Sequence, residues 1–237
     1  MTTSSVGAPA EVRERVDRLR ADIARVAVDV GRDPEGVHVV AVTKTFPAEV
    51  VQLATDLGFP EVAENRVAEL VQKHDDQRCA AVTTWHFIGQ VQRNKARQVA
   101  RYSDVIHSVD RPSLVEALSA AAVAEGRVLS CLIQLKQDND PQRGGALPAD
   151  LMEVAERIAA APGLVLGGLM AMPAPDLDPA EAYRAAAAEH RRLLRTYPTA
   201  TTFSAGMTGD WPAAVAAGAT HLRLGAAIVG PRAPRAH

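Results

Sequence analysis

The sequence predicts an α/β fold, a single (β/α)8 TIM-like barrel with an extra N-terminal helix. Eight short runs of apolar or β-branched residues alternate with stretches of helical periodicity, and strict strand–helix alternation produces parallel strand pairing. The length of 237 residues also suits such a barrel, for which about 250 residues are typical. No linker or change of composition divides the chain, so we expect one domain.

The first element is an amphipathic helix that precedes the barrel. Its apolar residues recur at steps of three and four from Val12 to Val30, and charged residues fill the opposite face. We expect residues 1–10 to form a flexible tail and residues 11–237 to form the barrel domain.

The first strand is predicted at residues 37–43, and a helix follows from Pro47 until Gly58. Later helices fill the intervals between strands, and one of them has Asp110 as an expected N-cap with Pro112 in its first turn. The remaining strands are predicted at residues 61–64, 85–89, 105–109, 128–135, 165–172, 201–206 and 221–225.

An open, doubly wound sheet is the alternative fold. Such a sheet usually has a glycine fingerprint after its first strand, where this chain has Thr43, Lys44 and Thr45. The pattern therefore favours the barrel. The longest polar loop, residues 137–148, is expected to lie over the barrel mouth.

Composition excludes several classes of function. The chain has 26 Lys and Arg against 28 Asp and Glu, so no broad positive field indicates a nucleic-acid or membrane partner. Cys79 and Cys131 show no disulfide framework and no metal-ligand spacing, which favours a cytoplasmic protein without a metal site. No stretch reaches the roughly 18 apolar residues of a membrane helix.

Lys44 is the first candidate for chemistry, because working groups of a barrel lie at the carboxyl ends of its strands. It directly follows an almost wholly apolar strand. Desolvation there would lower its pKa and supply a neutral amine that can attack an aldehyde. The alternative is a lysine that extends from the barrel rim into water.

Two glycine-containing turns, residues 204–210 and 223–230, follow the last two strands, where barrels often bind phosphate. Their glycines let backbone N–H groups approach an anion, and Ser204 and Thr208 offer hydroxyl groups. Glycines are also common in ordinary turns. Together with Lys44, however, the turns indicate a phosphorylated aldehyde as ligand.

With these residues in view, the chain resembles the pyridoxal-phosphate homeostasis protein family (YggS/PROSC-like) over residues 37–232. The resemblance implies a fold-type III barrel that binds pyridoxal 5'-phosphate (PLP) and lacks the second domain of alanine racemases. The matching segments are VAVTKTFP, AENRVAEL, WHFIGQVQRNKAR, HSVDR, GLMAMPAP, FSAGMTGDWPAAVAAGAT and RLGAAIVG.

The resemblance implies that Lys44 holds PLP as a covalent Schiff base. Asn65 would lie beside the cofactor ring, and Met170 and Met207 would line its pocket. Arg223 would face the pyridine nitrogen, to which an arginine can donate a hydrogen bond without supplying a proton. The other implied cofactor-binding residues are Ser204, Gly206, Thr208, Gly225 and Ala226.

Four positions depart from the family pattern. Ala63, Lys136 and Thr208 stand where glycine, asparagine and serine are usual. Ala226 stands where serine or threonine is usual, which removes a hydroxyl group from the implied phosphate site.

The resemblance implies a PLP carrier in vitamin B6 and amino-acid homeostasis, monomeric and serving PLP-dependent apo-enzymes, with no catalytic residue. A racemase would need a second base, and Tyr102, Tyr183 and Tyr197 all fall in helical stretches. A PLP-free Schiff-base aldolase is a third possibility. His86 and His107 are interpreted as hydrogen-bonded core residues.

Overall fold

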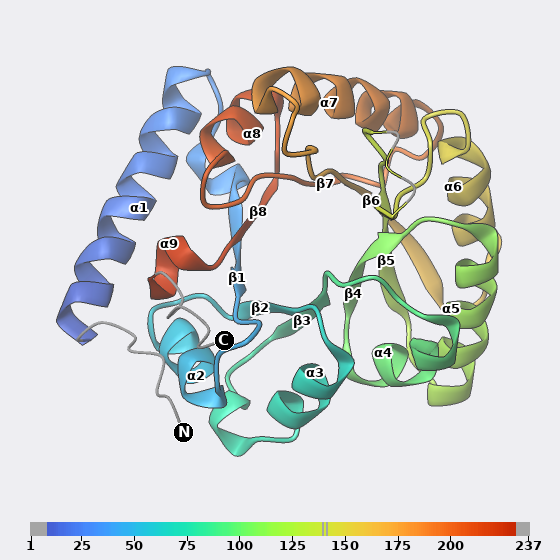
Figure 1. The fold of residues 1–237 in the computed structure, drawn as a ribbon, viewed down its shortest axis with the longest axis horizontal. Helices are drawn as coiled ribbons and strands as arrows, with labels where there is room; N and C mark the ends of the chain where they lie inside the picture. The colour runs from blue at the N-terminus through green and yellow to red at the C-terminus, as the bar shows by residue number, and fades with distance from the viewer. Residues whose placement is uncertain (1–8, 139, 141, 231–237) are drawn as a thin grey trace.

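The computed structural model describes residues 9–138, 140 and 142–230, and it confirms the predicted barrel. Eight parallel strands close in chain order, with β1 pairing to both β2 and β8 (Figure 1). The strands are β1 (His38–Val42), β2 (Glu61–Glu64), β3 (Thr84–Phe87), β4 (Val105–Val109), β5 (Leu129–Gln134), β6 (Leu164–Met170), β7 (Thr202–Ser204) and β8 (His221–Leu224). Each lies within its predicted run or begins one residue earlier.

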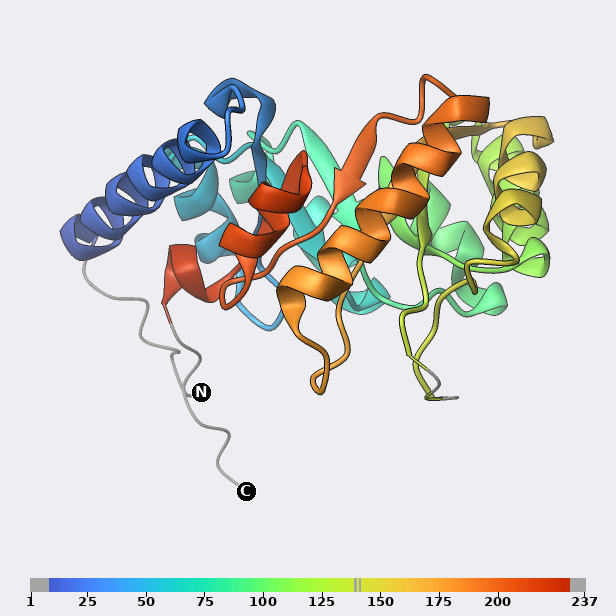
Figure 2. The ribbon, with the colours of Figure 1, turned by 90° about the horizontal axis from the view of Figure 1, so that it is seen from above.

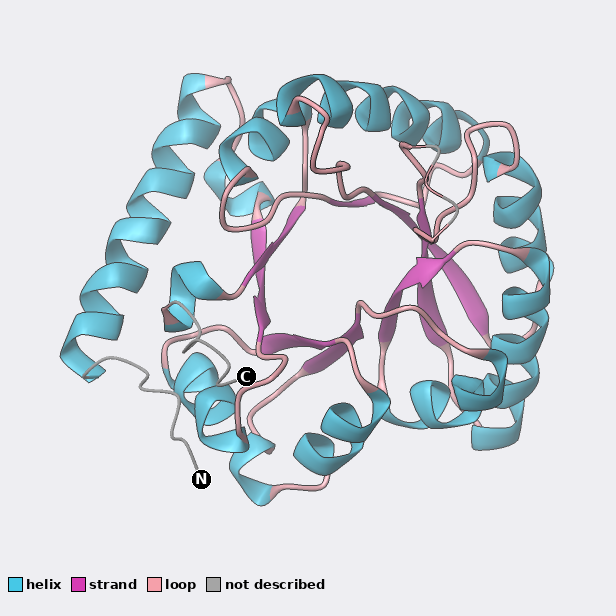
Figure 3. Ribbon diagram, in the orientation of Figure 1, coloured by secondary structure: helices cyan, strands magenta, loops and turns pink. Residues whose placement is uncertain are grey.

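Helices surround the ring of strands (Figure 3). Three short 3-10 helices, η1 (Pro34–Gly36), η2 (Gln77–Cys79) and η3 (Arg93–Lys95), interrupt the connections. The α-helices are α1 (Pro9–Asp29), α2 (Ala48–Asp56), α3 (Val67–His74), α4 (Ala96–Tyr102), α5 (Pro112–Glu125), α6 (Leu151–Ala160), α7 (Pro179–Thr196), α8 (Trp211–Ala217) and α9 (Ala226–Val229).

The predicted extra helix is α1, which begins at Pro9, and residues 1–8 of the predicted tail lie outside the described residues. Its apolar face packs beside α8 and α9, burying Val12 and Val16 completely. The Arg15 guanidinium donates to the carbonyl oxygen of Ile228 at 2.9 and 3.0 Å. This contact ties the helix to the last turn of the barrel.

One predicted helix cap is wrong. Arg111, not Asp110, is the N-cap of α5, and it makes no side-chain capping bond. The Asp110 carboxylate instead accepts a hydrogen bond from the Gly145 amide at 3.3 Å. The side chain is therefore used to hold the loop after β5, which a local sequence pattern does not reveal.

Side chains alternate between the two faces of each strand, so the barrel has an inner and an outer core. Val40, Val42 and Ala63 form a small buried cluster with Ile88 on the inner face. The much larger apolar cluster lies between the strands and the helices.

The loops after β5 and β6 extend from the same end of the barrel (Figure 2). Since all strands are parallel, this is the end at which every strand finishes. No helix in the described part of the chain is long and apolar enough to cross a membrane.

Candidate functional site

A cavity of about 760 Å³ opens at the carboxyl ends of the strands. Its volume is within the usual range for small-molecule sites. It brings together eight of the ten residues predicted to bind a cofactor, and their contact with a ligand stays a prediction. These eight are Lys44, Asn65, Met170, Met207, Thr208, Arg223, Gly225 and Ala226.

Lys44 is half-buried and lies one residue beyond the Thr43 that ends the β1 ladder. It lines the cavity together with Val42, as expected for side chains two residues apart on one face. The next residue, Thr45, has φ of +70°, a left-handed conformation that is costly for a β-branched residue. The Thr45 amide donates to the Glu69 carboxylate at 2.6 Å, which holds the chain in that turn.

Thr43 points away from the cavity into a buried ionic cluster. Its hydroxyl donates to Glu64 Oε1 at 2.6 Å, and the Lys73 ammonium donates to the same oxygen at 2.6 Å. Lys73 also donates to the carbonyl oxygen of Thr43 at 2.8 Å. The backbone that carries Lys44 is therefore fixed by side chains from β2 and α3.

Asn65 follows β2 and lines the cavity. Its Oδ1 is buried and has no hydrogen-bond partner within the described residues. A buried amide oxygen without a donor is unfavourable unless a ligand or water supplies one. The site is therefore prepared for a hydrogen-bond donor.

Two hydrogen bonds from its backbone amides to side chains fix the turn after β7. The Gly206 amide donates to the Tyr183 hydroxyl at 3.1 Å, and the Met207 amide donates to Asp210 Oδ1 at 2.6 Å. Gly206 has φ of +91° and is not among the residues that line the cavity. Thr208 does line it, and the Thr208 hydroxyl oxygen accepts from the Ala227 amide at 3.3 Å.

Arg223 is 5% exposed and reaches the cavity from β8. Its guanidinium donates to Ser204 Oγ at 2.7 Å and to the carbonyl oxygen of Ala171 at 3.0 Å. Ser204 is fully buried and lies outside the cavity lining, so its hydroxyl supports Arg223. The phosphate contact that the sequence indicated for Ser204 stays a prediction.

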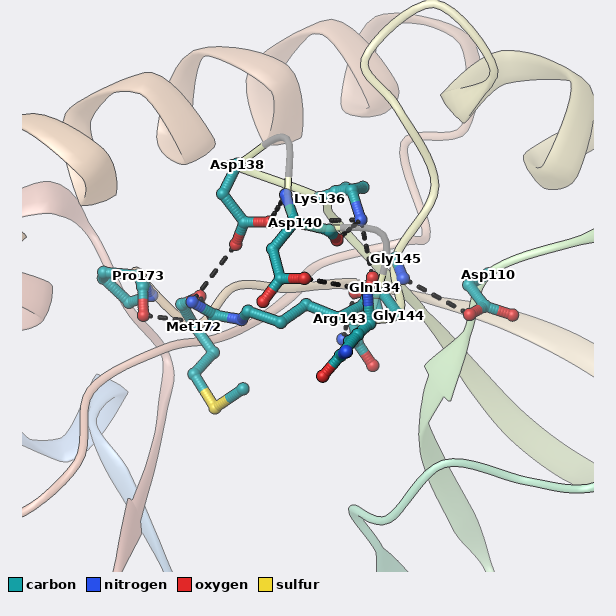
Figure 4. A network of polar contacts seen from close by, with 11 residues as sticks. Asp110, Gln134, Lys136, Asp138, Asp140, Arg143, Gly144, Gly145, Met172 and Pro173 are labelled. Carbon is teal, nitrogen blue, oxygen red and sulfur yellow. Dashed lines mark hydrogen bonds and ion pairs between the residues drawn. The ribbon is translucent and has the colours of Figure 1, made fainter. Parts of the chain in front are cut away.

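The loop after β5 borders the cavity, as the sequence predicted. Gln134 Nε2 donates to the carbonyl oxygen of Gly144 at 2.8 Å, and the Arg143 guanidinium donates to the carbonyl oxygens of Met172 and Pro173 at 3.1 and 3.2 Å (Figure 4). Arg143 also pairs with Asp138 at 3.1 Å. The loops after β5 and β6 are thereby joined at one side of the opening.

Several residues at the site were missed by sequence reasoning. Gln90, Gln134 and Arg143 line the cavity, and strand alternation could have pointed to Gln134. The interpretation of His86 and His107 as hydrogen-bonded core residues is confirmed, because they bond to each other at 2.8 Å and are 2% and 0% exposed.

No group of three His, Cys, Asp or Glu side chains that could hold a metal ion occurs among residues 9–138, 140 and 142–230. Arg223, moreover, forms no ion pair with a carboxylate in the same part of the chain. A permanently charged, buried guanidinium without a carboxylate is costly. The observation indicates a site that receives an acceptor or an anion from a ligand.

The model of the alanine racemase N-terminal domain family matches residues 15–233 of this parallel barrel. The chain therefore belongs to this family. An alanine racemase of Clostridium difficile has the same fold, with a TM-score of 0.63 and 13% identity over 81% of this chain and 51% of that one.

Within that class, the chain is a member of the pyridoxal phosphate homeostasis protein family. The relative from Escherichia coli is 37% identical over 227 residues, 94% of this chain and 97% of that protein. The relative from Mycobacterium tuberculosis is 35% identical over 240 residues, 94% of this chain and 93% of that one. The solved structure of PipY from Synechococcus elongatus with PLP bound has a TM-score of 0.80 and 32% identity, over 92% of this chain and 100% of that chain. The predicted family is confirmed.

Proposed function

We propose that this chain binds PLP as a Schiff base on Lys44 and acts as a non-catalytic carrier in vitamin B6 and amino-acid homeostasis. One observation carries the proposal: Lys44, Arg223 and the turns after β7 and β8 line a single cavity. PLP has an aldehyde, a pyridine nitrogen and a phosphate, and each of these groups would find a matching residue there. The PLP bound to PipY, a relative of this chain, supports the same ligand.

The residues present fit this cofactor. The Asn65 amide oxygen lacks a donor among the described residues, and a ring hydroxyl would supply one. Arg223 would donate to the pyridine nitrogen and gain an acceptor inside a buried site. Thr208, Gly225 and Ala226 would hold the phosphate.

Arg223 supports the proposal of low catalytic activity. Bound PLP serves enzymes as an electron sink, and that role is strongest with a protonated pyridine nitrogen. Arginine donates a hydrogen bond but keeps its own proton, so the ring would withdraw electrons weakly.

A racemase is the alternative. It requires an acid–base group on each face of the cofactor, and no tyrosine of the described chain lines the cavity. The Tyr183 hydroxyl accepts from the Gly206 amide, and burial raises the pKa of that hydroxyl. Incubation with alanine or serine followed by chiral chromatography should show no turnover; sustained racemisation would contradict the carrier proposal.

The covalent attachment is tested by borohydride reduction of PLP-loaded protein followed by peptide mass spectrometry. We expect a phosphopyridoxyl adduct on Lys44 and its loss in Lys44→Ala. Lys95→Ala is the matched control, because Lys95 is exposed on η3 outside the cavity. An adduct on another lysine in the wild-type protein would refute the assignment.

The cellular part of the proposal is a monomeric, cytoplasmic carrier that delivers PLP to apo-enzymes. Buried free thiols at Cys79 and Cys131 suit a reducing compartment. Mixing PLP-loaded protein with a PLP-dependent apo-enzyme should restore that enzyme's activity, and size-exclusion chromatography with light scattering reports the oligomeric state. If no PLP were transferred after prolonged incubation, the delivery part of the proposal would be contradicted and only storage of PLP would stand.

A further inference from the structure

A continuous line of hydrogen bonds crosses the barrel interior and ends at Arg223. Glu61 Oε2 lies 3.1 Å from His86 Nε2, and His86 Nδ1 lies 2.8 Å from His107 Nε2. His107 Nδ1 lies 3.0 Å from Ser204 Oγ, which accepts from Arg223 Nη1 at 2.7 Å. Five strands, β2, β3, β4, β7 and β8, contribute one side chain each.

The two ends of this line differ in their surroundings. His86, His107, Ser204 and Arg223 are at most 5% exposed, whereas the Glu61 side chain is 29% exposed. Glu61 begins β2, so it lies at the end of the barrel opposite the cavity. Arg223 lines the cavity itself. The line therefore connects the far mouth of the barrel with the candidate site.

The hydrogen bonds have one consistent direction. The bond from His86 keeps the pKa of Glu61 below its ordinary value, so the carboxylate is ionised and can only accept. A singly protonated His86 then donates from Nε2 and accepts at Nδ1. His107 must donate from Nε2 and accept at Nδ1 from the Ser204 hydroxyl, whose oxygen accepts from Arg223.

The electrostatics agree with a neutral His107 in the middle of the line. Burial, then the neighbouring His86 and Arg223, lowers the pKa of His107 well below its ordinary value. With one proton on each ring, every donor points toward Glu61.

We infer that Glu61, His86, His107 and Ser204 form a one-way hydrogen-bond chain that positions Arg223 at the floor of the cavity. The four are positioning residues, since they act through Arg223. The ligand that Arg223 would contact in the cavity rests on the proposed function, whereas the line of hydrogen bonds from Glu61 to Arg223 does not. Glu61 is the remote carboxylate toward which the buried guanidinium is polarised.

Other charged groups surround both ends. His38 and His221 lie near Glu61 with their ring centres 4.9 Å apart, and burial lowers the pKa of His221 to about 4. Near Arg223, Tyr183 and Asp210 raise the pKa of the guanidinium while burial, the largest effect, lowers it. Protonation of Glu61 is therefore the one change in this set that removes the final acceptor of the chain.

The direct test is two-bond ¹H–¹⁵N correlation NMR, which reports which ring nitrogen of each histidine carries a proton. The sample is histidine-labelled, full-length protein freed of PLP at about pH 7. We expect His86 and His107, assigned through a His107→Phe variant, to carry their protons on Nε2. Glu61→Leu removes the final acceptor and should bring out the Nδ1-protonated form of His107. Glu61→Gln, whose amide oxygen still accepts, should restore the wild-type pattern. If Glu61 had only a structural role, its substitution would not change which nitrogen of His107 carries the proton.

His190→Phe is the matched control, because His190 is also buried but bonds to the carbonyl oxygen of Ala200 outside this line. It should leave the His107 signals unchanged. A proton on His107 Nδ1 in the wild-type protein, or an unaltered His107 in Glu61→Leu, would overturn the inference.

A binding measurement tests the positioning of Arg223. Ser204→Ala removes the acceptor for a charged donor and should weaken PLP binding about tenfold, while His190→Phe should alter it by less than about twofold. An unchanged dissociation constant in Ser204→Ala would overturn the positioning role. If the wild-type protein bound no PLP, the proposed function would fail, and the NMR pattern would still decide whether the chain exists.

Discussion

Two glutamates on β2, three residues apart, lie in buried polar networks of opposite kinds. Glu64 faces the helices and forms a compact cluster with Thr43 and Lys73, in which a lysine supplies the counter-charge at 2.6 Å. Glu61 faces the barrel interior and begins a line that ends at Arg223, a buried cation without a carboxylate beside it in the described residues.

The difference separates architecture from function. A network whose charges balance within the protein fixes the backbone that carries Lys44, although Glu64 Oε2 has no hydrogen-bond partner among the described residues. A network that ends in an unbalanced cation at a cavity indicates that a ligand completes it.

The largest effect is expected from Lys73→Met. Removing the lysine leaves the Glu64 carboxylate buried without its counter-charge, which should lower the free energy of unfolding by about 3–5 kcal/mol. Chemical denaturation measures the loss. The double variant Lys73→Met/Glu64→Leu should recover most of it, and a double variant as unstable as the single one would contradict the account.

The loss of stability in Lys73→Met should depend on pH. Burial raises the pKa of Glu64 above its unfolded value, although Lys73 opposes the rise. The folded state then holds that proton more readily, so stability is retained at low pH and falls as the pH rises through the folded pKa. Without Lys73 the total fall is larger, and the destabilisation of Lys73→Met should be greater at about pH 8 than at about pH 5. Equal losses at both values would contradict it.

Gly206→Ala should be the next in size. Gly206 has φ of +91°, and an added Cβ would meet Ala214 at 2.8 Å and Leu222 at 2.9 Å. Strain and overpacking together should cost about 2–4 kcal/mol of unfolding free energy. Gly209→Ala in the same turn is the control, because nothing lies within 4 Å of an added Cβ there. Equal melting temperatures for the two variants would be the contrary result.

Ala226→Thr should strengthen ligand binding in the cavity. A hydroxyl placed at the cavity would add a charge-assisted hydrogen bond to phosphate, which should tighten PLP binding about tenfold. Ala227→Thr is the control on the same short helix, since Ala227 does not line the cavity. Equilibrium titration of PLP measures both, and an unchanged dissociation constant for Ala226→Thr would argue against phosphate at this turn.

The smallest stability effect is expected from Glu61→Gln. The amide oxygen still accepts from His86, and partial exposure spares the residue a large desolvation cost. We expect a change of less than about 1 kcal/mol in unfolding free energy, against about 3 kcal/mol or more for Glu64→Gln, which leaves Lys73 buried and unpaired. Similar losses for both would remove the distinction between the networks.

The sequence predicted the eight strands and the extra helix by its periodicity, and its resemblance to a known family indicated eight of the residues that line the cavity. It misplaced Asp110 as a helix cap and did not foresee that Ser204 lies beneath Arg223. Both side chains contact residues far away in the sequence. The line from Glu61 to Arg223 joins five strands, and only the closed barrel shows which inward side chains meet.

A crystal structure of the PLP-loaded protein tests the central claim most directly. The account predicts continuous density between Lys44 Nζ and the aldehyde carbon of the cofactor, with Arg223 at the pyridine nitrogen and the phosphate beside Thr208, Gly225 and Ala226. PLP attached to a different lysine, or bound outside this cavity, would contradict it.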